Sequence, residues 1–420
     1  MKAEILGCKT GVAVSGGMDS MALLDLYVKN GQDLIVINVE HGIRGKTSLR
    51  DSEFVKNYCA ERNIPFLGFS VNAPLYAEEK GVSVEVAARV LRYGIFRKLL
   101  DDGTVDRIAL AHHADDNTET VLMRILRGTG IGGLQGIRDS AEFIRPLLSY
   151  SRAEIIAYVK ENALPYVEDE SNFDSVYTRN FLRNEIIPLL KKRYPDLNAS
   201  FARLAENAAE VENYLSTQII PSFECEEGIF IPDVFACPDL IVKYSLNAAL
   251  KNMGVYQDVE RVHFNAVVGL KDKQNNAFLN LPYGVNVAKY NGGLLLYRPA
   301  KPFESIVFDG SEICSDGFIY RFFPSEKILK SCTADFDKLK GAVVRRKEEG
   351  DFFRKVNGKR KLLSDFLNER KLSVAAKDSL LVVADGKTVL AVLGLEVADE
   401  AKITSETKKI IHIIKEKQNL

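Results

Sequence analysis

The 420-residue sequence contains only six cysteines, and no two of them stand in a Cys-x-x-Cys pair. This absence argues against zinc ribbons and cysteine-bound iron–sulfur clusters. Scattered cysteines in a long chain are typical of a reduced cytoplasmic protein, which is the location we expect. The sequence also lacks an 18-residue apolar run, and its first residues, MKAEILGCKT, have no apolar signal core. We therefore expect no membrane-spanning helix and no secretory signal.

An excess of charge of either sign is also missing. The formal net charge is −1, with 46% hydrophobic and 27% charged residues, as in an ordinary globular protein. Overall basicity therefore gives no indication of a nucleic-acid partner, and any surface that binds one must be local. The length suggests two or three domains.

Strand-like and helical patterns alternate in the first third of the chain. The expected strands are 11–14, 34–39, 65–71 and 107–111. Between two of them, apolar residues at 84, 88, 91, 95 and 99 step by three or four, so we expect this stripe of a helix to face a sheet. This order predicts an α/β fold with a doubly wound parallel sheet, in which ligands bind beyond the carboxyl ends of the strands.

The pattern changes after about residue 150. Helices are expected at 151–162, 177–195 and 198–220, and hairpins at 277–299, where Tyr-Gly and Asn-Gly-Gly mark turns. The last hundred residues combine short strands with one helix, and Asp385-Gly386 marks a hairpin. We predict a catalytic domain at 1–215, a central domain at 216–305 and a small α+β domain at 306–420.

The segment SGGMDS, residues 15–20, lies between the first strand and the first helix. Glycines allow backbone N–H groups to approach an anion, and the helix N-terminus adds a positive dipole. Ser15 and Ser20 can donate to phosphate oxygens, although no Walker Gly-Lys-Ser/Thr follows. Asp19 would oppose an anion unless it holds a cation, most simply Mg²⁺. The simpler alternative is a plain strand-to-helix turn.

A second polar cluster, AHHADDNTET, follows the fourth expected strand. His112, His113, Asp115, Asp116 and Glu119 crowd one strand-to-helix corner. Five ionisable groups there need a compensating partner, which a metal–nucleotide would supply. Alternatively, the two aspartates only cap a helix. Zinc is disfavoured because no cysteine is near and carboxylates suit Mg²⁺ better.

Basic residues occur beside these clusters and near the C-terminus. Arg89 and Arg92 share one helix face, and one of them could reach a phosphate or a carboxylate, although a solvated face is the simpler interpretation. His41 and Arg44 follow the second strand as weaker candidates. Residues 338–371 hold 12 lysines and arginines against 5 acids, with phenylalanines interleaved. Such a segment is either a surface for a phosphate backbone or a solvated face.

Together these motifs resemble a known family. SGGMDS resembles the loop of the PP-loop ATP pyrophosphatases. A longer series of segments resembles, in order, the tRNA(Ile)-lysidine synthetase family: VEHGIRG, AHHADDNTETVLMRILRGTGIGGLQGI, RPLL, DESNFDSVYTRNFLRNEIIPLL and, near the C-terminus, RRKEEGDFFR, KRKLLSDFLNER and DSLLVVADGKTVLAVLGL. The resemblance covers both ends of the chain, and residues 220–310 are less distinctive.

The resemblance implies a ligase that forms a carbon–nitrogen bond. ATP would adenylate the wobble cytidine of an isoleucine tRNA with a CAU anticodon, and free L-lysine would displace AMP to give lysidine, which pairs with A instead of G. The partners implied are this tRNA, lysine, ATP with Mg²⁺, and a second copy of the chain in a homodimer.

The resemblance also implies roles for particular residues. The nucleotide phosphates would lie on Ser15, Gly16, Gly17, Met18, Asp19 and Ser20, with Asp19 near Mg²⁺. The catalytic group would be Asp19, Arg89, His112, Asp115 and Asp116, with the two last holding the lysine ammonium or the metal. The tRNA would contact the basic segment at Arg345, Arg346, Lys359, Arg360 and Lys361.

Some residues depart from the family pattern. Asn117 stands where Gln is more usual, and Asn38 and Glu40 differ from the usual His and Asn. A Pro-Arg pair expected near 372–374 is missing. Two other functions stay open: another PP-loop tRNA-modifying enzyme, such as a thiolase or an amidotransferase-type synthetase, and a non-catalytic RNA-binding protein. The thiolases that use clusters need paired cysteines, which this chain lacks.

Overall fold

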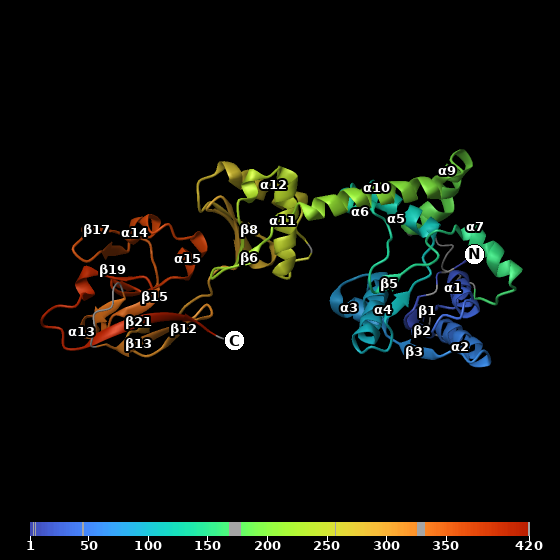
Figure 1. Cartoon of the computed structure of the whole chain (residues 1–420). Coiled ribbons are helices and arrows are strands. Elements are labelled where there is room, and N and C mark those ends of the chain that lie inside the picture. The colour runs from blue at the N-terminus through green and yellow to red at the C-terminus, as the bar shows by residue number, and fades with distance from the viewer. Residues whose placement is uncertain are drawn as a thin grey trace. The chain divides into compact units, whose positions relative to one another are not determined.

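The computed structural model describes residues 1–2, 4, 6–43, 46–167, 178–256, 258–325 and 332–418. The chain divides into two compact units, Met1–Tyr214 and Leu215–Leu420, called here unit 1 and unit 2. Each unit has its own sheets and cores, and they are described separately (Figure 1).

Unit 1 is built on a five-stranded sheet in the order β3-β2-β1-β4-β5, and all of its pairs are parallel. The strands are β1 Thr10–Ala13, β2 Leu34–Glu40, β3 Phe66–Ser70, β4 Arg107–Ala109 and β5 Phe143–Ile144. The helices are α1 Met18–Lys29, α2 Lys46–Glu61, α3 Ala73–Lys80, α4 Val84–Asp101, α5 Ala114–Leu126, α6 Ile131–Leu134, α7 Arg152–Glu161, α8 Thr178–Phe181, a π-helical turn Leu182–Ile186, α9 Ile187–Arg193 and α10 Leu197–Thr217.

Helices cover both faces of this sheet. One core joins β1 and β2 to α1, α2 and α7, and another joins the opposite face to α4. The predicted doubly wound sheet is therefore confirmed. The prediction for the stripe on α4 was only half right, because Ala88 and Leu91 pack against α3 while Ile95 and Leu99 pack against the sheet, and Val84 is 37% exposed.

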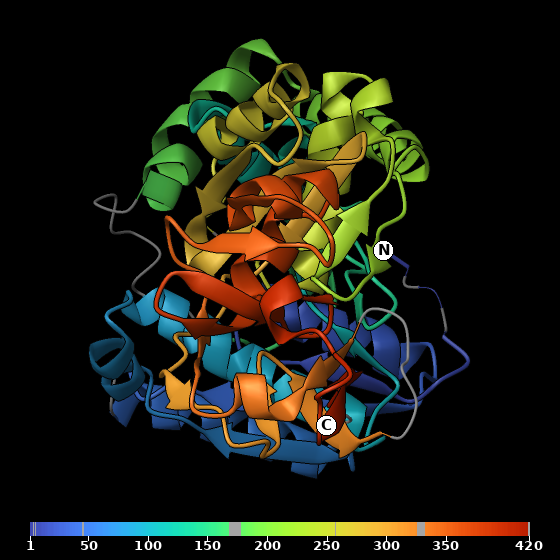
Figure 2. The ribbon, with the colours of Figure 1, turned by 90° about the vertical axis from the view of Figure 1, so that its left-hand side faces the viewer.

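The described residues of unit 2 form three sheets. The strands nearest the C-terminus are orange and red in Figure 2. The first sheet, β6-β7-β10-β9-β8, is antiparallel and shares an apolar core with two helices. Its elements are β6 Phe223–Glu224, β7 Ile229–Ile231, α11 Asp239–Asn252, α12 Arg261–Val268, β8 Phe278–Leu281, β9 Val285–Tyr290 and β10 Gly293–Tyr297, with 3₁₀ turns at Val234–Ala236, Gly269–Asp272 and Pro282–Gly284. The hairpins expected here are present, and Asn291-Gly292 makes the turn between β9 and β10 with both φ angles positive.

The other two sheets of unit 2 are β11-β15-β18-β19-β16-β17, with β20 paired to β19, and β12-β13-β21-β14. The strands are β11 Ile306–Val307, β12 Ile313–Ser315, β13 Phe318–Pro324, β14 Thr333–Asp335, β15 Val343–Arg346, β16 Phe352–Arg354, β17 Arg360–Leu362, β18 Leu381–Asp385, β19 Thr388–Val392, β20 Glu396–Val397 and β21 Ile410–Lys417. The helices are α13 Phe336–Leu339, α14 Leu363–Glu369, α15 Val374–Ser379 and a 3₁₀ turn Asp399–Ala401.

The hairpin at Asp385-Gly386 joins β18 to β19 as predicted. The expectation of a single helix near the C-terminus was wrong, since α13 and α15 accompany α14. Helices of four and six residues are too short to leave a periodic apolar pattern in the sequence. Among the described residues, no helix is both long and apolar enough to cross a membrane.

Candidate active site

The loop after β1 presents backbone amides at the N-terminus of α1. Gly16 has a φ of +90°, and a side chain there would also press on Val55, 3.3 Å away. Within the described chain, Gly17 caps α1 without a side-chain hydrogen bond, so the first amides of the helix have no side-chain cap. The Ser15 and Ser20 hydroxyls lie 3.3 Å apart, and Ser20 donates to the Gly17 carbonyl at 2.8 Å. This arrangement suits an anion.

Met18 and Asp19 open α1 in different environments. Met18 packs against the core of unit 1, so only its backbone faces the loop. The Oδ1 atom of Asp19 is buried and has no hydrogen-bond partner among the described residues. Burial raises the pKa of Asp19, and His113, 3.8 Å away, partly offsets this effect.

Asp19 has the chemistry of a Mg²⁺ ligand. Mg²⁺ in nucleotide sites is held by one or two carboxylates, water and phosphate oxygens, and does not need a full set of protein ligands. The described residues contain no group of three or more His, Cys, Asp or Glu side chains placed for a metal. The single unpartnered carboxylate oxygen therefore fits Mg²⁺ bound together with a nucleotide, and it does not fit a closed zinc site.

The second polar cluster begins α5, and His113 caps this helix. The Asp116 amide donates to His113 Nδ1 at 3.3 Å, and the His113 amide donates to Asp116 Oδ2 at 3.1 Å. The alternative that the aspartates cap the helix holds for Asp116, which completes a capping box, and not for Asp115. The other oxygen of Asp116 accepts from Arg183.

Two arginines that the sequence interpretation missed face Asp116 and Glu119. Arg183 donates to Asp116 at 2.8 Å and to Glu119 at 2.6 and 2.8 Å, and Arg179 donates to Glu119 at 3.0 Å. The carboxylates stand three apart on α5, and the arginines stand four apart across α8 and the π-helical turn. Each pair therefore lies on one face of its helix, and the two faces carry opposite charge. This match of spacing and charge is the sequence signal that could have identified the arginines.

Asp115 is directed into a different set of contacts. It accepts hydrogen bonds from the Arg152 amide at 2.8 Å and from Asn198 at 3.0 Å, and it pairs with Lys191. Burial would raise the pKa of Asp115, but these donors hold it below its usual value. Asp115 therefore joins α5 to α7, α9 and α10, and this geometry does not support the predicted role at the metal or at lysine.

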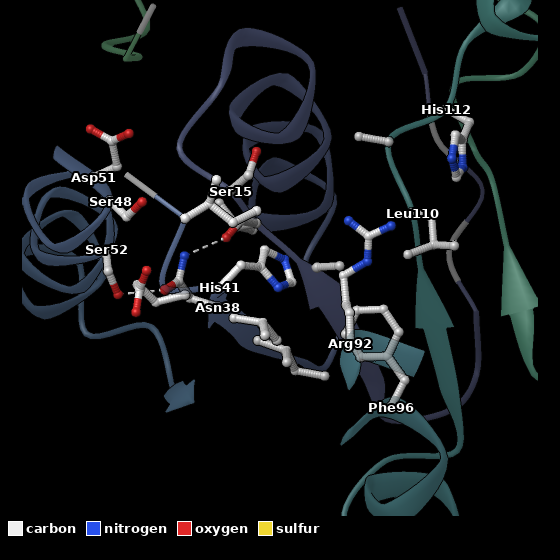
Figure 3. Close-up of a pocket in the computed structure, with 17 residues that line it drawn as sticks. Ser15, Asn38, His41, Ser48, Asp51, Ser52, Arg92, Phe96, Leu110 and His112 are labelled. Carbon is white, nitrogen blue, oxygen red and sulfur yellow. Dashed lines mark hydrogen bonds between the residues drawn. The ribbon is translucent and has the colours of Figure 1, made fainter. Parts of the chain in front are cut away.

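A cavity of about 390 Å³ opens at the carboxyl ends of β1, β2 and β4 (Figure 3). Three buried nitrogen atoms around it have no hydrogen-bond partner in the described chain: His41 Nδ1, Arg92 Nε and His112 Nδ1. In Figure 3 the Arg92 guanidinium group lies between the two imidazoles. Unpartnered buried polar atoms are costly, so this cavity is prepared for a polar or anionic ligand.

The electrostatics of the cavity point the same way. The pKa of His112 is lowered to about 4, chiefly by burial; Asp116 opposes this shift, and Arg145, Arg179 and Arg92 add to it. Burial and Arg92 also lower the pKa of His41. Both imidazoles are therefore neutral at pH 7, and Arg92 is the cation that lines the cavity.

Of the two candidate arginines on α4, Arg92 lines the cavity and Arg89 does not. Arg89 is exposed, and its guanidinium group lies 4.7 Å from the centroid of the Tyr93 ring. The two arginines are three apart, and the sequence pattern favours neither. Arg44, the other weak candidate, lies outside the described residues.

The residues that depart from the family pattern shape this region. Asn38 donates to the Val14 carbonyl at 2.8 Å and accepts from Ser52. Glu40 accepts from the Gly42 amide at 2.6 Å and from Ser70 at 2.9 Å. These bonds fix the end of β2 and the turn that carries His41.

Asn117 is a third departure, and it is buried. Its side-chain oxygen accepts from the Ile137 amide at 2.7 Å. A side chain at Gly136, which has a positive φ, would lie 2.1 Å from the same oxygen. Asn117 thus holds the glycine-rich segment after α5.

The basic segment of unit 2 divides into inward and outward groups. Arg345 is buried and forms two hydrogen bonds with Asp351, at 2.9 and 2.8 Å. Arg346 pairs with Asp316 and donates to the Lys301 carbonyl at 2.9 Å. Both arginines, predicted to contact tRNA, are instead committed to partners inside unit 2, because β15 places them against neighbouring loops.

The outward group contains the other three predicted residues. Lys359 is exposed and has no ion-pair partner in the described part of the chain. Arg360 is exposed, with its guanidinium group 4.3 Å from the Phe352 ring centroid. Lys361 pairs with Glu369 beside the buried ring of Phe366. This surface combines cations with an aromatic ring, as nucleic-acid surfaces do.

Comparisons with known proteins agree with these features. Residues 6–190 match the family model of the PP-loop domain. The tRNA(Ile)-lysidine synthase of Caldanaerobacter subterraneus subsp. tengcongensis is 31% identical over 449 residues, covering 96% of this chain and 93% of that protein. The tRNA(Ile)-lysidine synthase of Parabacteroides distasonis is 30% identical over 430 residues, which cover 95% of this chain and 94% of that protein.

Among solved structures, the U34-tRNA thiolase NcsA of Methanococcus maripaludis with its 4Fe-4S cluster is 20% identical, covers 48% of this chain and 73% of that chain, and has a TM-score of 0.42. This likeness is too low to bear on function. The sequence matches, in contrast, extend over nearly the whole length of both chains. The chain belongs to the tRNA(Ile)-lysidine synthase family.

Proposed function

We propose that the protein is a ligase that joins free L-lysine to C2 of the wobble cytidine of an isoleucine tRNA with a CAU anticodon. ATP is the second substrate, and AMP and pyrophosphate are the products. Lysidine would change decoding from AUG to AUA. The observation that carries the proposal is the cavity at the sheet edge, where His41, Arg92 and His112 keep buried nitrogen atoms that have no partner among the described residues. Asp19, in the first turn of α1, has a buried oxygen atom of the same kind.

The reaction requires two bond exchanges. O2 of the cytidine attacks the α-phosphorus of ATP, the bond to the β-phosphate oxygen breaks, and pyrophosphate leaves. The ε-nitrogen of lysine then bonds to C2 while the C2–O2 bond breaks, O2 leaves with AMP, and the nitrogen loses its extra proton. Negative charge is present on phosphate throughout, so donors and cations that are already in place favour both steps.

The chain supplies two groups of donors for the nucleotide. The amides of residues 15–20 and the Ser15 and Ser20 hydroxyls would hold the phosphates. Asp19 would bind Mg²⁺, which offsets phosphate charge. Arg92, between neutral His41 and His112, would hold the phosphoryl group that stays with AMP.

Lysine carries an ammonium and a carboxylate, and the chain has a matching four-residue cluster. Asp116 and Glu119 carry negative charge, and Arg179 and Arg183 carry positive charge. We propose that lysine is held here, with its ammonium on Asp116 or Glu119 and its carboxylate on an arginine. Asp115 is left out because its donors come from α7, α9 and α10, whereas Asp116 and Glu119 pair with the two arginines of the cluster.

Binding of tRNA is assigned to unit 2 together with the cavity. Lys359, Arg360 and Lys361 are the cations proposed to contact its phosphates. The division of this region into a central domain at 216–305 and a C-terminal domain at 306–420 stays a proposal, as does the homodimer, which light scattering of the purified chain tests.

The decisive experiment uses ATP labelled at the α-phosphate, with tRNA and lysine each added or omitted. We expect labelled AMP only when both are present, and labelled lysine in the RNA. AMP that depends on tRNA but not on lysine would support another PP-loop modification. RNA binding with no AMP under any combination would support a non-catalytic protein instead.

A further inference from the structure

The end of α9 continues the helical face that forms the acidic corner. Along this face, Arg183 contacts Asp116 and Glu119, Ile187 is buried, and Lys191 pairs with Asp115. Tyr194 follows three positions later, as the residue that caps the C-terminus of α9. Tyr194 is therefore placed about one turn beyond the last contact with the corner.

This last turn is exposed and carries unpaired positive charge. Tyr194 is 60% exposed, and Leu189, five residues earlier, is 63% exposed. Lys192 and Arg193 are exposed, and neither has an ion-pair partner among the described residues, in contrast to Lys191. An exposed aromatic ring and two cations without ion-pair partners among the described residues thus follow directly after Lys191, which pairs with Asp115.

An unpaired loop of RNA matches this surface in charge and in shape. A cytidine can enter a cavity only if it leaves the stack of its loop, which exposes the faces of neighbouring bases. Aromatic side chains receive such bases by stacking, and nearby cations hold the adjacent phosphates. A membrane or an acidic peptide would use the charge but would not need the ring.

We propose that Lys192, Arg193 and Tyr194 hold the anticodon loop at the entrance of the active site, with Tyr194 stacked on an unpaired base and the two cations on phosphates. The proposal rests on the proposed function, since it takes tRNA as the substrate. It adds a contact in unit 1 that is independent of the basic surface of unit 2.

The first test places 2-aminopurine in the anticodon loop of the tRNA transcript, next to the wobble cytidine. Stacking on Tyr194 should quench its fluorescence when the full chain binds. The quench should be lost in Tyr194→Ala and kept in Tyr194→Phe. Tyr256→Ala, which removes another exposed tyrosine, is the control that should leave it unchanged.

The second test measures tRNA affinity against salt. Lys192→Ala/Arg193→Ala should reduce the slope of log K against log salt by roughly 1.4 to 1.8 for two phosphate contacts. Arg97→Ala/Lys98→Ala removes an adjacent pair of exposed cations on α4 and should leave the slope unchanged. Circular dichroism should show the same unfolding midpoint for all variants, because the substituted side chains are exposed.

The outcomes separate this proposal from the proposed function. If the unmodified chain forms lysidine and both Tyr194→Ala and the double variant behave like it, the surface on α9 does not bind the loop. If the unmodified chain neither binds this tRNA nor forms lysidine, the proposed function fails first. A loss of quench in Tyr194→Phe as well would mean that the hydroxyl, and not stacking, makes the contact.

Discussion

The cavity of unit 1 and the basic segment of unit 2 use buried charge in opposite ways. In unit 1, the half-buried Asp19 and Arg92 each have one buried polar atom with no hydrogen-bond partner in the described chain, and Arg92 lines the cavity. In unit 2, Arg345 is buried and bonded to Asp351 and to two carbonyl groups. Both regions contain ionisable residues in motifs that appeared functional in the sequence.

The difference distinguishes a site from a structural pair. A buried polar group without a partner lowers stability, so it persists where a ligand compensates for it. A buried charge with a full set of partners stabilises the local fold relative to the same charge left alone. We therefore assign ligand binding to Asp19 and Arg92, and the architecture of unit 2 to Arg345.

The largest expected effect is on catalysis, in Arg92→Ala. Removing a donor that is already placed for a phosphoryl group should lower kcat for AMP formation by roughly 10²–10³-fold. The free energy of unfolding should stay equal or rise, because a buried cation without a counterion is removed. Steady-state kinetics and urea unfolding of the same preparation measure both quantities.

Arg89→Ala is the matched control, since Arg89 lies three residues away on the same helix and is exposed. It should leave kcat within about twofold. A loss of activity in Arg89→Ala equal to that in Arg92→Ala would reverse the assignment of the two arginines.

The next largest effect is on stability, in Arg345→Ala. Asp351, whose side chain is fully buried, would lose its partner, and breaking such a pair costs about 3–5 kcal/mol. Unfolding of unit 2, followed by differential scanning calorimetry, should occur at lower temperature. Arg345→Met/Asp351→Leu should recover most of the loss, and failure to recover would show that Arg345 does more than neutralise Asp351.

The fold of unit 1 was predictable because parallel strands and their helices repeat a strong pattern. Four of the five strands of the sheet, β1 to β4, followed from it, whereas β5, which has only two residues, was not predicted. The direction of individual side chains could not be predicted from the pattern. Asp115 and Asp116 are adjacent in sequence and yet contact different helices. Arg345 is a similar case, because composition alone does not show whether a basic residue faces water or a buried acid.

The arginines of α8 and the π-helical turn show a second limit. Arg179 and Arg183 meet Glu119 only because the chain returns to α5 after some sixty residues. Pairing across such a distance depends on tertiary packing, which a single sequence does not reveal. Complementary spacing on two helices reduces the number of residue pairs that could form, but it does not show which of them forms.

A smaller effect is expected for the outward cations of unit 2. Replacing Lys359, Arg360 and Lys361 by Ala should weaken tRNA binding and reduce the slope of log K against log salt by up to about 3 units, at roughly 0.7–0.9 for each lost phosphate contact. Filter binding at several salt concentrations measures the slope. An unchanged slope would show that this surface, although exposed, does not face RNA.

The smallest effect concerns His112 and the pH dependence of stability. Burial lowers its pKa in the folded chain to about 4, below the ordinary value of 6.5. As the pH falls from 6.5 to 4, the unfolded chain therefore takes up a proton that the folded chain does not, and the folded state loses stability. Below about pH 4 both states bind the proton and the loss stops.

In His112→Gln, the urea midpoint of unfolding should change less steeply with pH between 6.5 and 4, by the contribution of one proton. Above pH 7 the dependence on pH should be the same as in the unmodified chain. An identical pH profile in the variant would mean that the pKa of His112 is the same in the folded and unfolded chain, and that burial in the cavity does not lower it.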